Sequence, residues 1–117
     1  MDVTPLIGRD RKVIQSYGVD GFRISSETFA RNVVVFPDHV EDFDSLPQFL
    51  AQKPDLDVLV FGSSRGFGGV DFDGRQQARA QKIIIEAMDL GAACRTYNVL
   101  MAEGRRVAAI LIFDSAA

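Results

Sequence analysis

The sequence predicts an α/β fold, with residues 1–117 forming a single compact domain built on a mixed sheet. Two apolar runs, Val33–Phe36 and Val58–Phe61, are continuous, which is typical of strands covered on both faces. From Asp57 onward, strand and helix patterns alternate, which favours parallel β-α-β crossovers with helices packed on the sheet. A chain of 117 residues, 47% of them hydrophobic, suffices for one core but not for two.

The first third of the chain adds antiparallel character to the sheet. Val13–Tyr17 and Gly21–Ile24 are predicted strands joined by a reversal rich in glycine and aspartate, so we expect a hairpin. Phe29–Phe36 is predicted to form a central strand that Pro37 ends. An acidic stretch follows, interpreted as a solvated loop, with Asp38, His39, Glu41, Asp42 and Asp44.

A short helix and four longer elements complete the prediction. The short helix has Pro47 in its first turn, and its apolar face consists of Phe43, Leu46, Phe49 and Leu50. The remaining elements are strand Asp57–Gly62, helix Asp73–Lys82, strand Ile83–Met88, helix Ala92–Glu103 and strand Val107–Phe113. Helix 73–82 has almost no apolar face, so we expect it mostly in solvent, with Asp73 as its cap. Gly104 ends helix 92–103.

Two loops follow strands at the sheet edge where ligands bind in open α/β folds. The first, Gly62–Gly69, offers glycines, Ser63, Ser64 and Arg65, which suit the approach of an anion, with Arg65 as the principal candidate. It matches neither a P-loop nor a dinucleotide fingerprint. The alternative interpretation, slightly favoured, is that the glycines only permit a long turn.

The second loop, 89–95, leads into the helix that carries the only cysteine. Asp89 is predicted to cap this helix, which would place Cys94 in the first turn beside Arg95, where the helix dipole would lower the thiol pKa. Nucleophilic catalysis needs a positioned base, and the only histidine, His39, follows a different strand. We therefore favour a buried structural cysteine over a reactive one.

Three further polar residues follow the cysteine on the same helix. Thr96, Tyr97 and Asn98 are expected either to pin the helix to neighbouring segments or to face a ligand or partner, and the sequence favours neither. The candidate site for a ligand or partner therefore comprises Ser63, Ser64, Arg65, Asp89, Cys94, Arg95, Thr96, Tyr97 and Asn98. No catalytic residue is assigned.

Composition excludes several classes of function. A net charge of −3 with interspersed signs provides no basic surface for nucleic acid. One cysteine and one histidine do not suggest a metal site, and we expect no cofactor. The start of the chain lacks a signal-peptide pattern and no segment has the length of a membrane span, so a cytoplasmic protein is expected. The oligomeric state stays open, a homo-oligomer included.

Several segments carry a resemblance that covers nearly the whole chain. They are 17–24, 34–37, 57–62, 86–100 and 103–109, and the most specific stretch is Ala-Ala-Cys-Arg-Thr-Tyr-Asn at 92–98. They resemble the MTH-like family of small proteins of unknown function, which includes the mitochondrial respiratory complex I assembly factor three. The sequence departs from the family at Gly62–Ser64, where Gly-Thr-Gly is usual.

Two functional hypotheses follow. The resemblance implies a compact α/β domain with no established activity or cofactor and, for its mitochondrial members, a role in complex I assembly. The preferred hypothesis is therefore a non-catalytic interaction protein whose partners are respiratory complex I subunits or assembly factors. The alternative is a small-molecule or anion-binding protein, with or without catalysis, whose site is formed by loops 62–69 and 89–95.

Overall fold

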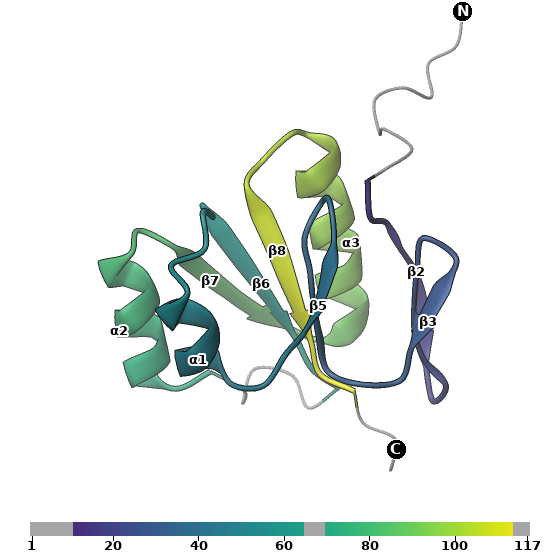
Figure 1. Ribbon diagram of the computed structural model, residues 1–117, viewed down its shortest axis with the longest axis horizontal. Coiled ribbons are helices and arrows are strands. Elements are labelled where there is room, and N and C mark those ends of the chain that lie inside the picture. Colours follow the sequence, from purple (N-terminus) through teal and green to yellow (C-terminus); the bar gives the residue numbers. More distant parts are fainter. Residues whose placement is uncertain (1–10, 65–69, 114–117) are drawn as a thin grey trace, which may run out of the picture.

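A computed structural model describes residues 11–64 and 70–113 and contains a five-stranded mixed sheet (Figure 1). The strands are ordered β5-β4-β8-β6-β7. Their bounds are β4 Val33–Val35, β5 Val40–Asp42, β6 Val58–Gly62, β7 Ile84–Met88 and β8 Val107–Leu111. The last three in chain order are parallel, while β4 pairs antiparallel with both β5 and β8. The predicted mixed sheet with a parallel second half is confirmed.

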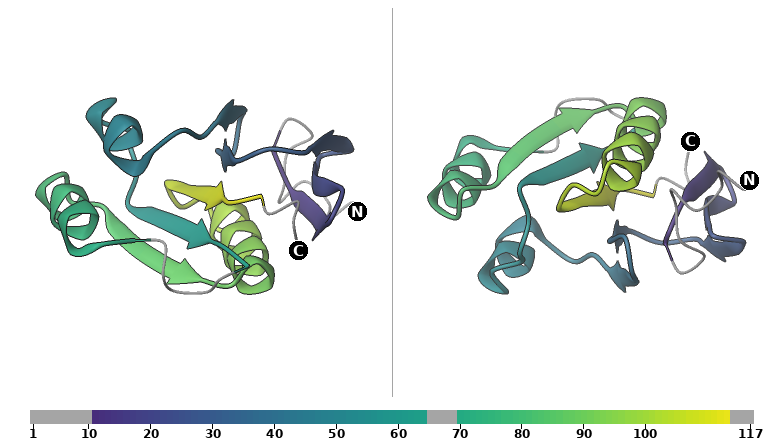
Figure 2. Two further views of the ribbon diagram at one scale, coloured as in Figure 1. Left: turned by 90° about the horizontal axis from the view of Figure 1, so that it is seen from below. Right: turned by 90° about the horizontal axis from the view of Figure 1, so that it is seen from above.

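Helices cover both faces of this sheet, as its apolar strands require (Figure 2). Helices α1 (Leu46–Ala51) and α2 (Phe72–Ala80) contribute to the core on one face, and α3 (Leu90–Ala102) packs on the other. In the inner strands β4, β8 and β6, alternate side chains enter the two cores. In β6, for example, Val58 and Val60 face the α3 side, whereas Leu59 and Phe61 face α1 and α2.

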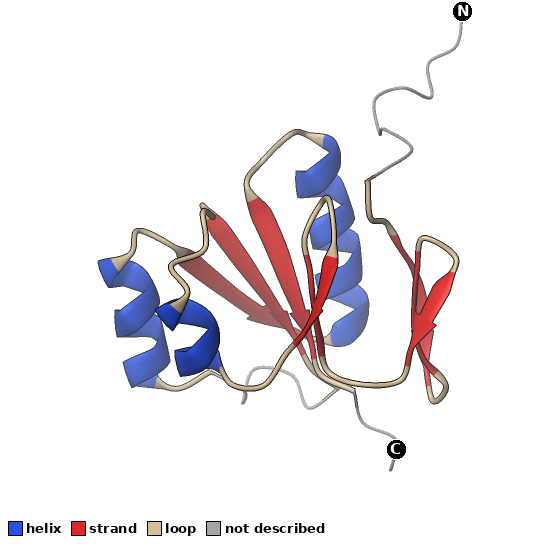
Figure 3. Ribbon diagram, viewed as in Figure 1, coloured by secondary structure: helices blue, strands red, loops and turns tan. Residues whose placement is uncertain are grey.

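A second, three-stranded sheet lies beside α3 (Figure 3). It consists of β1 (Ile14–Gly18), β2 (Gly21–Ile24) and β3 (Glu27–Phe29), all antiparallel. The predicted hairpin is therefore confirmed. Gly21 is required where β2 begins, since its φ is +119° and a Cβ would lie 2.3 Å from the Phe29 carbonyl oxygen. The side chains of Phe22 and Ile24 are buried in the core between α3 and the large sheet.

The predicted strand Phe29–Phe36 is wrong in extent, because Phe29 ends β3 of the small sheet and only Val33–Val35 form β4. Its interior place is confirmed, since β4 lies between β5 and β8 and its three valines are fully buried. The chain changes sheets at Asn32, whose Oδ1 accepts a hydrogen bond from Phe113 N (2.7 Å) and whose backbone carbonyl accepts one from Phe43 N (3.0 Å). A polar residue thus satisfies backbone groups at the crossing point, which local propensity does not reveal.

The acidic stretch predicted to be a solvated loop contains the edge strand β5. Val40 of this strand pairs with Val35 of β4. His39 directly precedes β5, and its imidazole forms hydrogen bonds with the carboxylates of Asp38 (2.6 Å) and of Glu41 in the strand (2.7 Å). The same ring stacks on Phe36. Exposed charges on a short edge strand are a common protection against edge pairing, which explains why the strand reads as a loop.

The helix boundaries differ from the prediction by one or two residues. Helix α1 contains the expected Pro47 in its first turn, and α2 lies mostly in solvent as expected. Asp71, not Asp73, caps α2, accepting a hydrogen bond from Gly74 N at 2.7 Å. Helix α3 begins at Leu90 because Asp89 is its N-cap, so Cys94 falls in the second turn and not in the first.

Candidate functional site

The two predicted loops begin side by side at one edge of the large sheet. Strands β6 and β7 are parallel neighbours with Gly62 opposite Met88, and Ser63 N donates to Met88 O (3.3 Å). Ser63 is buried and Ser64 is exposed. Arg65, the principal candidate in the predicted anion loop 62–69, lies outside the described residues together with the rest of that loop from position 66 on.

Helix α3 is held close to the sheet at its start. Asp89 caps it as predicted, with Oδ1 accepting from Ala92 N at 2.8 Å. A Cβ placed on Gly62 of β6 would lie 2.5 Å from the Cβ of Ala93, far inside van der Waals contact. The pairing of a strand glycine with a helix alanine therefore sets the close approach of α3 to β6.

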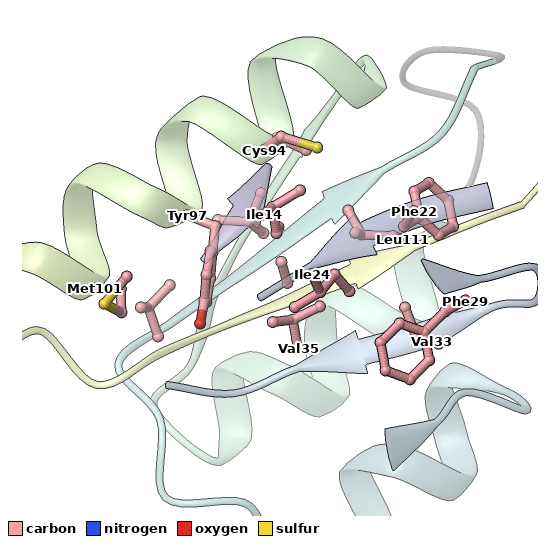
Figure 4. Packing of buried hydrophobic residues seen from close by; sticks show 14 of the residues in the cluster. Ile14, Phe22, Ile24, Phe29, Val33, Val35, Cys94, Tyr97, Met101 and Leu111 are labelled. Carbon is pink, nitrogen blue, oxygen red and sulfur yellow. The ribbon is translucent and has the colours of Figure 1, made fainter. Parts of the chain in front are cut away.

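Cys94 is part of the packed core. Its side chain is 6% exposed, and it lies on the face of α3 that is turned toward Ile14, together with Tyr97 and Met101 (Figure 4). Burial raises the pKa of the thiol to about 11, although the neighbouring positive charge of Arg95 acts in the opposite direction. The predicted lowering by the helix dipole is wrong, because desolvation dominates in the second turn, and the favoured structural cysteine agrees with this geometry.

Tyr97 and Asn98 attach the start of the chain to α3. The Tyr97 side chain is fully buried, and its hydroxyl donates to Lys12 O (2.8 Å). The side chain of Asn98 bonds both backbone groups of Ile14 in β1, as a neighbouring strand would. Its Oδ1 accepts from Ile14 N (3.0 Å) and its Nδ2 donates to Ile14 O (2.9 Å). Of the two interpretations left open by the sequence, this geometry favours pinning, and the segment pinned lies 84 or more positions away.

Arg95 and Thr96 have different surroundings from these two anchors. Thr96 is half-buried on α3, while Arg95 is exposed and lines a hollow of about 560 Å³ between α3 and β1. Gly91 forms part of the same wall, and a Cβ there would lie 2.7 Å from the Tyr17 hydroxyl. Arg95 is thus the one candidate side chain among the described residues that brings a charge to this hollow.

A second hollow, of about 180 Å³, is lined mainly by apolar groups at the strand ends. Its walls come from Tyr17, Gly18, Val19, Phe22, Ser64, Leu90 and Phe113. Of this set, Ser64 was a predicted site residue and Leu90 lies within the predicted loop 89–95. The available signal was the hairpin turn, where apolar Val19 stands at a position that ordinarily favours polar residues, and it is 66% exposed.

Within residues 11–64 and 70–113, the chain holds no group of three or more histidine, cysteine or acidic side chains arranged to bind a metal ion. His39 is engaged with its own acidic neighbours on β5 and the preceding turn. None of the described helices combines the length and hydropathy that crossing a bilayer requires.

The fold and this site define a small α/β domain whose polar cluster on α3 is largely structural and whose two site hollows lie beside α3 and the β1–β2 hairpin. Residues 14–112 match the family model described as "Protein of unknown function (DUF498/DUF598)", and the chain belongs to this family. The resemblance noted from the sequence is thereby confirmed.

Three proteins are similar to this chain, two in sequence and one in fold. NADH dehydrogenase (ubiquinone) 1 alpha subcomplex assembly factor 3 of Danio rerio is 29% identical over 110 residues, which are 86% of this chain and 63% of the relative. The chain thus spans less than two thirds of that relative. An uncharacterized protein of Rhodobacter capsulatus is 30% identical over 105 residues, covering 85% of this chain and 82% of the relative. The solution structure of a Bordetella pertussis protein described as a Mth938-like domain has the same fold, with a TM-score of 0.77 at 22% identity over 99% of this chain and 93% of that one.

Proposed function

We propose that this chain is a non-catalytic interaction protein that assists the assembly of NADH:ubiquinone oxidoreductase. The observation that carries the proposal is that the polar residues of α3 have structural roles. The Asp89 side chain caps the helix, the Tyr97 and Asn98 side chains bond the backbone of residues 12 and 14, and the Cys94 thiol is buried. The proposed partner, complex I, comes from two relatives that are named as complex I assembly factors.

The apolar hollow at the strand ends is the proposed contact surface. Tyr17 and Val19, which are half or more exposed, stand at its rim, while Phe22 and Leu90 form its wall. Exposed apolar side chains around a hollow stabilise a complex by leaving water when a partner side chain enters. A partner that presents an apolar side chain fits this surface better than a charged ligand does.

The alternative is a small-molecule or anion-binding protein that uses the strand ends and Arg95. It is supported by the larger hollow beside Arg95. It is weakened by the Asp89 carboxylate, which already accepts an amide hydrogen bond at the start of α3 and repels an approaching anion. We therefore prefer the interaction protein.

A pull-down from a native membrane extract tests the proposal. The wild-type chain is expected to recover complex I subunits or assembly intermediates, identified by mass spectrometry. Val19→Glu places a charge at the rim of the apolar hollow and is expected to lose this recovery. Val99→Glu is the matched control, since Val99 is 56% exposed on α3 and does not line the hollow. Recovery of no complex I component by the wild type, or equal recovery by both variants, would count against the proposal.

A further inference from the structure

Strand β7 is an outer edge of the five-stranded sheet and carries backbone groups that β6 does not use. Ile84 N donates to Asp57 O, and Met88 O accepts from Ser63 N. In a parallel ladder alternate residues bond to the same neighbour, so Ile84, Glu86 and Met88 face β6. The backbone N–H and C=O groups of Ile83, Ile85 and Ala87 therefore point away from the sheet.

Part of this edge is already occupied from within the domain. Ile83 N donates to Ala78 O at the end of α2, and Arg75 Nη1 donates to Ile85 O at 3.2 Å. Among the described residues, the N–H groups of Ile85 and Ala87 have no hydrogen-bond acceptor beyond the sheet. Unpaired groups in a row are the template on which a further strand adds.

A groove of about 240 Å³ runs along the same edge, and its charge is uniformly positive. The groove is lined by Arg75 and Arg79 of α2, by Lys82 two residues after that helix, and by Ile83–Ile85. None of these three cations forms a salt bridge within residues 11–64 and 70–113. Ile84 lies between Ile83 and Ile85, its side chain points to the other face of the sheet from theirs, and it is 60% exposed.

We propose that the edge of β7 binds an extended, acidic segment of a partner protein as an added strand. Side chains of an added strand alternate between the two faces of the sheet. Those on the α2 side would meet Arg75, Arg79 and Lys82, and those on the other side would lie beside Ile84. The segment that fits best alternates acidic and apolar residues.

A second copy of this chain fits the edge less well. Pairing of two β7 edges around a twofold axis would bring the three cations of one copy against those of the other. Pairing of β7 with the acidic edge strand β5 would be a head-to-tail contact that continues into an open filament. In addition, Asp42 of β5 is paired with Arg31, and Glu41 is hydrogen-bonded to His39. An acidic segment of another protein is the occupant that the charges favour.

The Arg75 guanidinium has two positions in this proposal. In the isolated chain it covers Ile85 O and so shields the edge from unselective pairing. When an acidic strand approaches, the same guanidinium can transfer to a carboxylate, which is a stronger charge-assisted partner than a carbonyl, and release Ile85 O to the added strand. An apolar or basic strand offers no such exchange. The proposal stands whether or not the partner belongs to a respiratory complex.

The test uses the whole chain and a labelled peptide of about seven residues that alternates glutamate and valine. Fluorescence anisotropy at low salt measures binding, with the lysine–valine peptide of equal length as the control for charge. Hydrogen exchange followed by NMR locates it. The amides of Ile85 and Ala87, which point outward, are expected to become protected, whereas those of Ile84 and Glu86 are protected already by β6.

Two variants separate the charge from the backbone edge. Arg79→Glu is expected to weaken binding about tenfold, while the exposed Arg23 of the small sheet, changed to glutamate, leaves it within about twofold. Ala87→Pro removes an outward N–H that β6 does not use, a position where edge strands tolerate proline, and is expected to weaken binding several-fold. Thermal unfolding checks that each variant is folded; if Ala87→Pro is not, the Arg79→Glu result and the amide protection still decide.

Three results would overturn the proposal. The first is equal binding of the lysine–valine peptide, because the cations would then select nothing. The second is binding without protection of the Ile85 and Ala87 amides, which would place the peptide elsewhere. The third is a protein that self-associates alone and is made monomeric by Arg79→Glu, since a second copy would then occupy the edge.

Discussion

Replacing Asn98 by alanine removes both side-chain hydrogen bonds that hold β1 against α3. The Oδ1···H–N bond from Ile14 N is 3.0 Å long and the Nδ2–H···O bond to Ile14 O is 2.9 Å. Each bond contributes about 1 kcal/mol net, and half-buried backbone groups left without partners add to the loss. The free energy of unfolding is therefore expected to fall by about 2 kcal/mol, or about 8 °C in Tm for a domain of this size.

Urea unfolding followed by circular dichroism measures the global effect, and amide exchange at Ile14 measures the local one. Val99→Ala is the matched control, because Val99 is the next residue on α3 and its side chain is largely exposed, so its loss should change stability by no more than about 0.5 kcal/mol. Asn98→Asp keeps the acceptor but replaces the amide donor with a carboxylate oxygen facing Ile14 O. It should be at least as destabilising as alanine.

The reasoning is refuted if Asn98→Ala stays within about 0.5 kcal/mol of the wild type and leaves the Ile14 amide as protected as before. That result would mean that the apolar contacts of Ile14 alone hold β1 in place. A loss confined to exchange at Ile14, with unchanged global stability, would mean that the hairpin opens independently of the large sheet.

Other side chains give further tests. Cys94 should resist a thiol reagent at pH 8 in the folded chain and react once urea unfolds it. The stability that its raised pKa contributes is fully present below pH 9.0 and is lost as the pH rises toward about 11. Replacing Cys94 by alanine should therefore flatten the decline of stability in that range. Gly62→Ala should cost about 1–3 kcal/mol in denaturant unfolding, because the new methyl group meets Ala93, and no loss would show that α3 can retreat from the sheet. Burial lowers the pKa of His39, but hydrogen bonds to two carboxylates outweigh it and raise the pKa above 6.5, so NMR titration should find a raised value and the associated stability should disappear as the pH rises through it.

Local patterns predicted the elements of this fold where hydrophobicity and capping agree. The apolar strands β6 and β8 were expected within one or two residues of where they lie. Pro47 falls in the first turn of α1 as expected, although Phe43, assigned to the apolar face of that helix, lies before it. Asp89 was expected to cap α3 because a side-chain oxygen three residues before an amide is a local relation. The resemblance to the family, carried by the segment around Cys94, pointed to the same fold.

Patterns failed where a residue's role depends on a distant partner. Nothing in the acidic stretch indicates that Val40 pairs with Val35, because a three-residue edge strand with exposed charges looks like a loop. The division of Phe29–Phe36 between two sheets depends on Asn32 meeting Phe113, 81 positions away. The same limit applied to Cys94, whose position near a helix start suggested a lowered pKa until the packing around it was known.

The sequence by itself determined the α/β class, the order of strands and helices from β6 onward and the family, because each rests on periodicity, capping or motif along the chain. Only the tertiary structure decided that Tyr97 and Asn98 hold strand β1, that the Cys94 thiol is buried, and that Arg75, Arg79 and Lys82 gather beside the outer edge of β7. The physical reason is that hydrogen bonding, desolvation and charge clustering depend on distances through space, which the order of residues does not contain.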